Sequence, residues 1–472
     1  MKIVKSLLLL IFIPGFVFSQ NKSSFQTDID LLLKNDFFKT AAAAIEIYDL
    51  TDSKILYRKN EKLLLKPASN LKLLTSAAGL VFLGPDYKFS TSVYHTGEVI
   101  DSICYGDIYF VGGCDPDFTS DELDSLTGEI KNFGIKEIKG NLYGDVSMLD
   151  SLFWGNGWMW DDELSKDFPY FTPLIINDAC VKIEYSPANI GEEVKINILT
   201  PINYFNIRNT SQTIKSDSSN FSIKRDWVNR NNNIAAEGNL FYKTEKDTVT
   251  INIVNPGLYF LKLAEQSLLN NGIKINGHCE FNPLPEEAEK IFAWERNYGE
   301  VILNLNKESD NLSAEMTLRA ISNKYFGNPA TAENGIKVQD SLIVLTGLNP
   351  ADYRIVDGSG VSHYNLISAE LLTQLLKYIY RDQKKLYPLF WESLPVGGVD
   401  GTLKNRMKNS PAFNNVHAKT GTLSGVSSLS GYLKTKNDHL IAFSIIIQNY
   451  KGSSKTARNF QDEICKLLSE YK

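Results

Sequence analysis

Three short motifs in the sequence contain residue types that together could carry out acyl transfer. They are Ser69–Lys72 (Ser-Asn-Leu-Lys), Ser309–Asn311 (Ser-Asp-Asn) and Lys419–Thr422 (Lys-Thr-Gly-Thr). A serine hydroxyl becomes an effective nucleophile when a neighbouring base takes its proton. Because positions i and i+3 share one face of a helix, a helix that begins near Ser69 would place the Lys72 amine beside the Ser69 hydroxyl.

The proton needs a base and a route to the leaving group. Lysine is neutral near pH 7 only when burial or another cation lowers its pKa, and Lys419 could be that cation for Lys72. The Ser309 hydroxyl could pass the proton to a leaving amine. The amide of Asn311 could hold both Lys72 and the peptide bond of a substrate.

The third motif suits a substrate that ends in a carboxylate. Lys419 and the hydroxyls of Thr420 and Thr422 could bind that carboxylate. Gly421 would let the substrate backbone approach closely as an added strand. The backbone N–H groups of Ser69 and Thr422 could form an oxyanion hole.

Each motif alone also fits a structural role. Ser69 could be a helix N-cap, Ser309–Asn311 a loop that caps the next helix, and Lys419–Gly421 a turn. The three motifs in this order, each before the expected element, favour the catalytic interpretation. No Ser/His/Asp set competes, so we read His417 as a structural histidine and Ser359 as part of a structural turn.

The elements that must position these motifs come from both ends of the chain. Residues 42–48 and 54–57 read as a hairpin that leads to Ser69, and residues 428–433 and 440–447 read as the last strands. We expect these strands to share one sheet. A closing helix near residues 457–468 follows from its 3.6-residue apolar period.

The middle of the chain has a different pattern. Short strand-like runs with Gly and Asp turns predict a β-rich insertion over residues 86–289, including strands at 89–94, 99–104 and 108–111. Further expected helices are 120–133, 258–271, 311–325, 335–346 and 366–382. The boundaries then give a domain made of 20–85 and 290–472 that is interrupted by the insertion.

The composition narrows the range of protein classes to which the chain could belong. The chain has 472 residues, a net charge of -6 and 43% hydrophobic residues, which is typical of a globular protein and gives no reason to expect nucleic-acid binding. Residues 1–19 read as a secretory signal peptide, and no later run is long enough for a membrane span. Five cysteines leave at least one unpaired within a monomer. Cys104 and Cys114 could form a disulfide or remain free.

The sequence resembles the D-alanyl-D-alanine carboxypeptidase/endopeptidases of the penicillin-binding protein 4 type, the low-molecular-mass class C penicillin-binding proteins. Besides the three motifs, the resemblance rests on the strings at residues 111–116, 157–162, 176–178, 356–362 and 394–403. Two departures are Cys114, where the family often has a third glycine, and Tyr170-Phe-Thr-Pro in place of Tyr-Gly-Ala-Pro.

The resemblance implies a multidomain α+β fold. Its penicillin-binding-protein/β-lactamase-like transpeptidase domain would be an antiparallel sheet flanked by helices, with the large β-rich insertion. It also implies an exported, periplasmic serine hydrolase that forms an acyl-enzyme on Ser69, cleaves peptidoglycan stem peptides and is acylated by β-lactams. No metal or other cofactor is implied, and Asp162 resembles the residue that meets the amino end of the peptide's diamino acid. A β-lactamase-like hydrolase and a non-catalytic peptidoglycan-binding protein are the alternatives, and the oligomeric state stays open.

Overall fold

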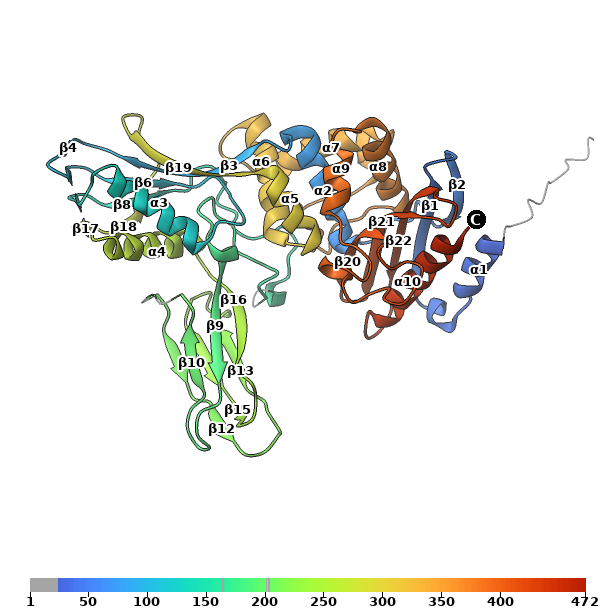
Figure 1. Cartoon of the computed structure of the whole chain (residues 1–472), viewed down its shortest axis with the longest axis horizontal. Coiled ribbons are helices and arrows are strands. Elements are labelled where there is room, and N and C mark those ends of the chain that lie inside the picture. The colour runs from blue at the N-terminus through green and yellow to red at the C-terminus, as the bar shows by residue number, and fades with distance from the viewer. Residues whose placement is uncertain (1–23, 163–164, 201, 203) are drawn as a thin grey trace, which may run out of the picture.

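The computed structural model describes residues 24–472 except 163–164, 201 and 203, so the predicted signal peptide lies outside the described residues. Within the described part, none of the helices combines the length and the apolar character that crossing a membrane requires. Figure 1 shows three regions: a sheet with helices at the C-terminal side, a mixed α/β unit at the opposite end, and a separate β unit below them.

Both ends of the chain build one antiparallel sheet, as the sequence predicts. Its strand order is β2–β1–β22–β21–β20. The bounds are β1 Ala42–Asp49, β2 Lys54–Lys59, β20 His417–Leu423, β21 Val426–Lys434 and β22 Leu440–Gln448. Strand β1 pairs with β22 along its whole length, from Ala42 opposite Gln448 to Asp49 opposite Ile441. The first hairpin is therefore fixed by the last strand of the chain.

Helices cover both faces of this sheet. Helix α1 (Ser24–Leu32) and helix α10 (Lys455–Glu470) pack on one face, and α8 (Ala369–Asp382) packs on the other. The core on the first side includes Phe25, Ile29, Ile464 and Leu468. The apolar period predicted for the closing helix is thus the stripe of α10 that faces the sheet.

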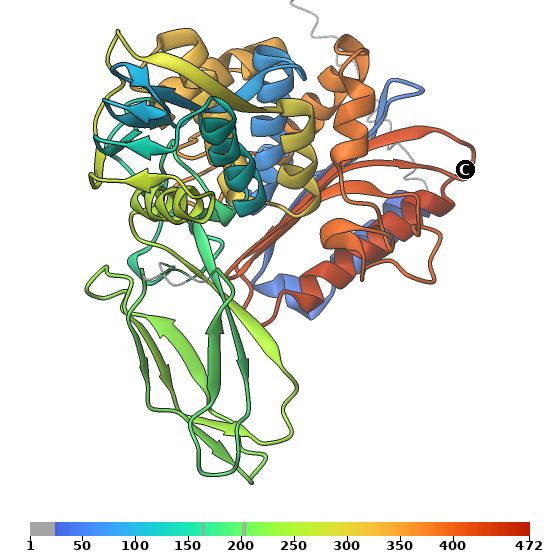
Figure 2. The same cartoon turned by 60° about the vertical axis from the view of Figure 1, so that its left-hand side comes forward.

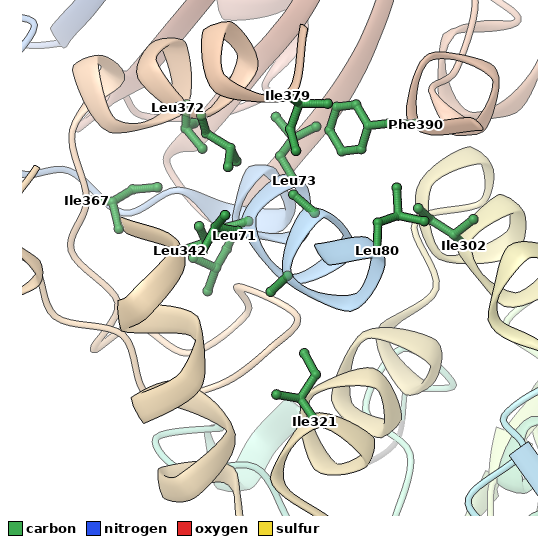
Figure 3. Close-up of a cluster of buried hydrophobic side chains, with 14 of the residues drawn as sticks. Leu71, Leu73, Leu80, Ile302, Ile321, Leu342, Ile367, Leu372, Ile379 and Phe390 are labelled. Carbon is green, nitrogen blue, oxygen red and sulfur yellow. The ribbon is translucent and has the colours of Figure 1, made fainter. Parts of the chain in front are cut away.

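Helix α2 (Lys72–Ala78) lies at the centre of the helical layer. All seven of its residues are buried, because α2 packs against α5 (Tyr298–Lys307), α6 (Asn311–Phe326), α7 (Ala332–Leu345) and α8. Figure 3 shows Leu71 and Leu73 surrounded by Leu342, Ile367, Leu372, Ile379 and Phe390. A helix without an exposed face is fixed in position on every side. The sequence analysis assigned neither α5 nor the short helix α9 (Tyr387–Ser393).

The insertion begins with an α/β lobe (β3–β8, β17–β19, α3 and α4). One sheet has the order β18–β8–β6–β3–β19 and a smaller one the order β17–β7–β5–β4. The bounds are β3 Lys88–His95, β4 Val99–Ile100, β5 Ile103–Cys104, β6 Ile108–Val111, α3 Ser120–Asn132, β7 Glu137–Ile138, β8 Leu142–Asp145, α4 Pro256–Asn270, β17 Lys274–Ile275, β18 Cys279–Phe281 and β19 Glu289–Asn297.

Two expectations for this lobe need revision. The single strand expected at residues 99–104 is wrong: Asp101 and Ser102 have positive φ angles and form a turn that separates β4 from β5. Strand β19 pairs with β3 from residue 289 to residue 297, within the sheet of the lobe. We therefore propose that the insertion extends to Asn297 instead of ending at residue 289.

A second unit, the β lobe (β9–β16), projects away from the rest of the molecule (Figure 2). Its three small sheets have the orders β10–β9–β16, β11–β14–β13 and β12–β15. The bounds are β9 Cys180–Ser186, β10 Lys195–Ile198, β11 Ile207–Asn209, β12 Gln212–Ile214, β13 Ser222–Arg225, β14 Ile234–Glu237, β15 Asn239–Phe241 and β16 Asp247–Asn252.

We predict that Leu73→Ala lowers the free energy of unfolding by about 2–5 kcal/mol, because it leaves a cavity in a fully packed helix contact. Leu73 is fully buried. Urea denaturation followed through tryptophan fluorescence measures the change. The matched control is Leu63→Ala, since Leu63 is 44% exposed and its truncation should change the free energy by less than about 0.5 kcal/mol. Equal effects of the two substitutions would contradict this account of the α2 core.

Candidate active site

The first motif lies where a 3₁₀ turn, Ala68–Leu71, runs into α2. This turn sets Ser69 three residues before Lys72, and the Lys72 Nζ atom lies 2.9 Å from the Ser69 Oγ atom. Ser69 is partly exposed, whereas Lys72 is fully buried. Ala68 has a positive φ of 49°, and its carbonyl packs closely against Gly360. The turn thus presents the serine at the surface while its lysine stays inside.

The Lys72 amine has two further partners from distant segments. Its Nζ atom lies 2.5 Å from the Asn311 Oδ1 atom and 2.8 Å from the carbonyl oxygen of Ser359. These two oxygens can only accept hydrogen bonds, whereas the Ser69 hydroxyl can donate. A neutral amine has two N–H bonds and one lone pair. The Lys72 amine thus donates to all three oxygens when it is charged, and loss of one proton leaves it a lone pair that can accept from the Ser69 hydroxyl.

Burial lowers the pKa of Lys72 to about 8, while the carboxylates of Asp310, Asp357, Glu315 and Asp167 act in the opposite direction. This corrects one expectation: burial, not Lys419, is the main cause. The pKa of Lys419 is also lowered, well below its usual value, first by burial and then by the charge of Lys72. Both amines lie in a region where a positive charge is costly.

The loop Asp357–Gly360 holds the carbonyl that Lys72 contacts. The buried Glu315 of α6 accepts hydrogen bonds from the backbone N–H groups of Gly358 and Ser359, each at 2.9 Å. Glu315 in turn forms an ion pair with Arg319 at 2.8 Å. Ser359 is thus the structural turn that the sequence indicates, but its backbone carbonyl is also a site group. Sequence reasoning missed this because any residue type has a carbonyl oxygen.

A tryptophan of the insertion supports the same loop. The Trp158 Nε1 atom donates to the Asp357 carboxylate at 3.0 Å, and that carboxylate also accepts from the backbone of Gly360 and Ser362 and from the Asn365 amide. The strings at residues 157–162 and 356–362 therefore meet in space.

The second motif joins α5 to α6. Ser309 has a positive φ of 64°, Asp310 caps α6 by accepting from the Ser313 N–H, and Asn311 is the first residue of α6. The amide nitrogen of Asn311 donates to the carbonyl oxygen of Asp167, which belongs to the insertion. Asn311 thus accepts from Lys72 on one side and donates to a peptide carbonyl on the other.

The third motif lies in β20, the last strand of the sheet order, and not in a turn. Lys419 is fully buried and donates to the Thr420 carbonyl oxygen at 3.1 Å. Its own carbonyl accepts from the Asn70 side chain at 3.0 Å. The Thr420 hydroxyl lies 2.8 Å from that of Thr402, and the exposed Thr422 hydroxyl accepts from Arg458 at 3.2 Å.

Gly421 faces the turn that carries Ser69. A Cβ atom at position 421 would lie 2.9 Å from the backbone nitrogen of Ser69, 2.9 Å from the Pro67 carbonyl oxygen and 2.2 Å from the Ser428 Oγ atom. Glycine therefore lets strand β20 approach the nucleophile's backbone. The first and third motifs, from opposite ends of the chain, meet here.

Asp162 lies at the end of a short 3₁₀ turn, Trp160–Asp162, where its carboxylate accepts from the Met159 N–H at 3.1 Å. Burial raises its pKa, and the nearby His363 acts in the opposite direction. His363 contacts Lys66 at 3.1 Å, three residues before Ser69. Asp162 is thus on the side of the site that the insertion forms, and its role toward a substrate stays a prediction.

Other candidate groups have structural roles. The His417 ring stacks on Trp391 with centroids 4.1 Å apart, and burial lowers its pKa to about 4, so it is neutral near pH 7. All five cysteines are free, which favours the unpaired alternative for Cys104 and Cys114.

Among the described residues, Asp49, Asp52 and His439 could together face a metal ion, but Lys54 and His439 already form ion pairs with these carboxylates.

Comparison with known proteins decides the family. Residues 25–471 match the model of the D-Ala-D-Ala carboxypeptidase 3 (S13) family. The chain belongs to this family. The S13 assignment agrees with the resemblance seen in the sequence and makes the protein a member of a family of serine D-Ala-D-Ala carboxypeptidases.

Individual S13 relatives cover most of the chain. A D-alanyl-D-alanine carboxypeptidase of Actinomadura sp. (strain R39) is 30% identical over 94% of this chain and 84% of its own length. The carboxypeptidase DacB of Haemophilus influenzae is 28% identical over 87% of this chain and 86% of its own length.

Solved structures confirm the expected fold class. The crystal structure of penicillin-binding protein 4 from H. influenzae has a TM-score of 0.84 at 25% identity and covers 94% of this chain and 100% of its own. A structure of that protein in complex with a β-lactam has the same fold, with a TM-score of 0.78 at 24% identity over the same shares of the two chains.

The lowered pKa of Lys72 predicts the pH dependence of acylation. A lysine that acts as the base must be neutral, so the rate should rise as Lys72 loses its proton, by about 50-fold between pH 6 and pH 8 for a pKa of about 8. Stopped-flow measurement of penicillin acylation at each pH checks this, with circular dichroism as a control for folding. A rate that does not change between pH 6 and pH 8 would contradict the role of Lys72 as base.

The contact between β20 and the Ser69 turn predicts a large effect of Gly421→Ala. The added methyl group would push the strand away from the Ser69 and Pro67 backbone. We expect the acylation rate constant to fall by about 100-fold, the effect typical of a displacement of about 1 Å in a catalytic group. Gly128→Ala is the control, because no atom lies within 4 Å of a Cβ there. Acylation rates that match for the two variants would argue against this close approach.

Proposed function

We propose that the protein is an exported serine D-Ala-D-Ala carboxypeptidase, with D,D-endopeptidase activity, that hydrolyses peptidoglycan stem peptides through an acyl-enzyme on Ser69. The observation that carries the proposal is the buried Lys72 amine, 2.9 Å from the Ser69 hydroxyl and bonded to Asn311. A neutral lysine in this position can take the proton of the serine as its oxygen attacks a carbonyl.

In the acylation step, the Ser69 oxygen forms a bond to the carbonyl carbon of the penultimate D-alanine, and its proton moves to Lys72. The carbonyl becomes an oxyanion, which the backbone N–H groups of Ser69 and Thr422 stabilise. The oxyanion then reforms the carbonyl as the C–N bond breaks. Ser309 passes the proton from Lys72 to the leaving amine, which is terminal D-alanine or the amine of a cross-bridge.

Water completes the reaction. Lys72 takes a proton from the water as the water oxygen attacks the acyl-enzyme, and the proton then returns to the Ser69 oxygen as the ester bond breaks. This second step releases the shortened peptide as a carboxylate and regenerates the neutral lysine.

The other groups orient the substrate. The buried Lys419 becomes charged most readily when a carboxylate accompanies it, which suits a peptide that ends in D-alanine. The Thr420 and Thr422 hydroxyls add hydrogen bonds to that carboxylate, and Gly421 gives the substrate backbone access to the edge of β20. The Asn311 amide, which contacts the carbonyl of Asp167, would hold the peptide bond of the substrate, and Asp162 would meet the amino group of a diamino acid.

A β-lactam should acylate the same serine. Its amide is strained, and its departing amine remains tethered to the acyl group. The H. influenzae structure with a bound β-lactam, a protein of the same fold, supports this extension. The predicted signal peptide supports export, and a periplasmic location follows from a peptidoglycan substrate.

We expect penicillin to add one covalent adduct to the wild-type protein and none to Ser69→Ala, as measured by intact-mass spectrometry. Ser424→Ala, which removes another exposed serine near the site, is the control and should keep the adduct. Mass spectrometry of muropeptides after incubation should show loss of D-alanine or of cross-links. No adduct on the wild type, or no change in the muropeptides, would overturn the proposal, and rapid turnover of nitrocefin would indicate a β-lactamase.

A further inference from the structure

A large cavity lies where the β lobe joins the rest of the insertion. Its volume is about 860 Å³, within the range of small-molecule binding sites. It is lined by residues within 146–154 together with Trp160, by residues 170–173, by residues 227–230 of the β13–β14 connection, by residues 254–256 before α4, and by Phe281 of β18. The reaction proposed for Ser69 uses none of these lining residues. We call it the aromatic cavity because Phe153, Trp154, Trp160, Tyr170 and Trp227 form much of its wall.

Two of these rings form a stack at the mouth. The Trp160 and Trp227 rings lie with centroids 4.9 Å apart and planes 23° from parallel. Trp160 is 70% exposed and the adjoining Val228 is 72% exposed. Large apolar side chains gathered around an open hollow are typical of a binding surface. Flat indole faces suit a ligand with flat apolar faces.

Polar groups occur at separate points of the same wall. Asp150, Arg230 and Asn255 line the cavity beside the aromatic rings. A mostly apolar hollow with a few hydrogen-bonding side chains fits a ligand that combines apolar faces with polar edges. A pyranose ring has this character, because its C–H faces are apolar and its hydroxyl and amide groups lie at the edge.

The segment that lines the cavity also reaches the candidate active site. Trp154 of the wall packs on Trp158 with centroids 5.2 Å apart, and Trp158 donates to Asp357 in the loop beside Lys72. Further along the same segment, the Asp167 carbonyl accepts from Asn311. The cavity wall and the candidate active site are therefore connected through packed side chains of the insertion.

We propose that the aromatic cavity binds the amino-sugar strand of peptidoglycan, the polymer to which the stem peptides are attached. The inference rests on the proposed function, since it assumes that the peptide at Ser69 belongs to such a strand. The sugar rings stack on Trp227 and on the adjoining aromatic side chains, and Asp150 and Arg230 bind their polar edges. The β lobe then serves to select peptides that are still attached to glycan.

A test needs separate sugar and peptide probes. The sugar probe is glycan strands from which an amidase has removed all peptides, and the peptide probe is diacetyl-L-Lys-D-Ala-D-Ala. We expect the full chain to bind the peptide-free strands, and Trp227→Ala to weaken this binding by about tenfold. Trp227→Phe, which keeps a ring, should restore much of the affinity. Hydrolysis of the tripeptide should change by less than about twofold in both variants, because Trp227 is in the β lobe.

Two further variants keep the outcome clear. Phe153→Ala, in another part of the wall, should also weaken glycan binding. If Trp227→Ala does not fold, this variant tests whether the cavity binds glycan. Tyr242→Ala removes an exposed ring of the β lobe outside the cavity and should bind the strands like the wild type.

Several results would overturn the inference: no binding of peptide-free strands by the wild type, equal binding by all variants, or competition by the tripeptide for the strands. Failure of the proposed function is a separate result. In that case the wild type would not release D-alanine from the tripeptide, whatever its binding to glycan.

Discussion

The burial of one amine constrains the rest of the structure. Lys72 can serve as a base near neutral pH because its Nζ atom is removed from water, which lowers its pKa to about 8. A buried amine without partners would be costly, so each of its hydrogen-bonding positions must be filled. The partners come from the 3₁₀ turn at Ser69, the start of α6 and the loop at Ser359. The fully buried α2 keeps this amine at the point where the three segments meet.

The insertion contributes to the same constraint. The loop beside Lys72 depends on the Asp357 carboxylate, and the indole N–H of Trp158 is one of its donors. The Asp167 carbonyl satisfies the amide of Asn311. Trp158 and Asp167 are thus packed against the groups around Lys72, and the nearby Trp154 and Trp160 line the aromatic cavity. The insertion and the helices around α2 therefore share one set of contacts near Lys72.

The sequence was informative where chemistry depends on residue type and spacing. Ser69, Lys72, Asn311 and Gly421 could be proposed as site residues because a hydroxyl, an amine and an amide side chain, and a glycine that lacks a side chain, are visible in the sequence. The shared sheet followed from strand patterns at both ends. The contacts made by the Ser359 and Asp167 carbonyls could not be predicted from the sequence, because every residue has a backbone carbonyl oxygen. The contact between Trp160 and Trp227 depends on how two lobes pack, which local periodicity does not report.

The pairing of β1 with β22 has a consequence for the order of events in biosynthesis. The hairpin β1–β2 is made early, but its neighbour β22 is made near the end of the chain. The sheets of the insertion contain only residues 88–297 and can form sooner, whereas the sheet beside Ser69 must wait for the last segment. Lys72 likewise acquires its acceptors only after residue 359 has been added. A chain whose last strand has not yet been made therefore lacks the sheet that lies beside Ser69.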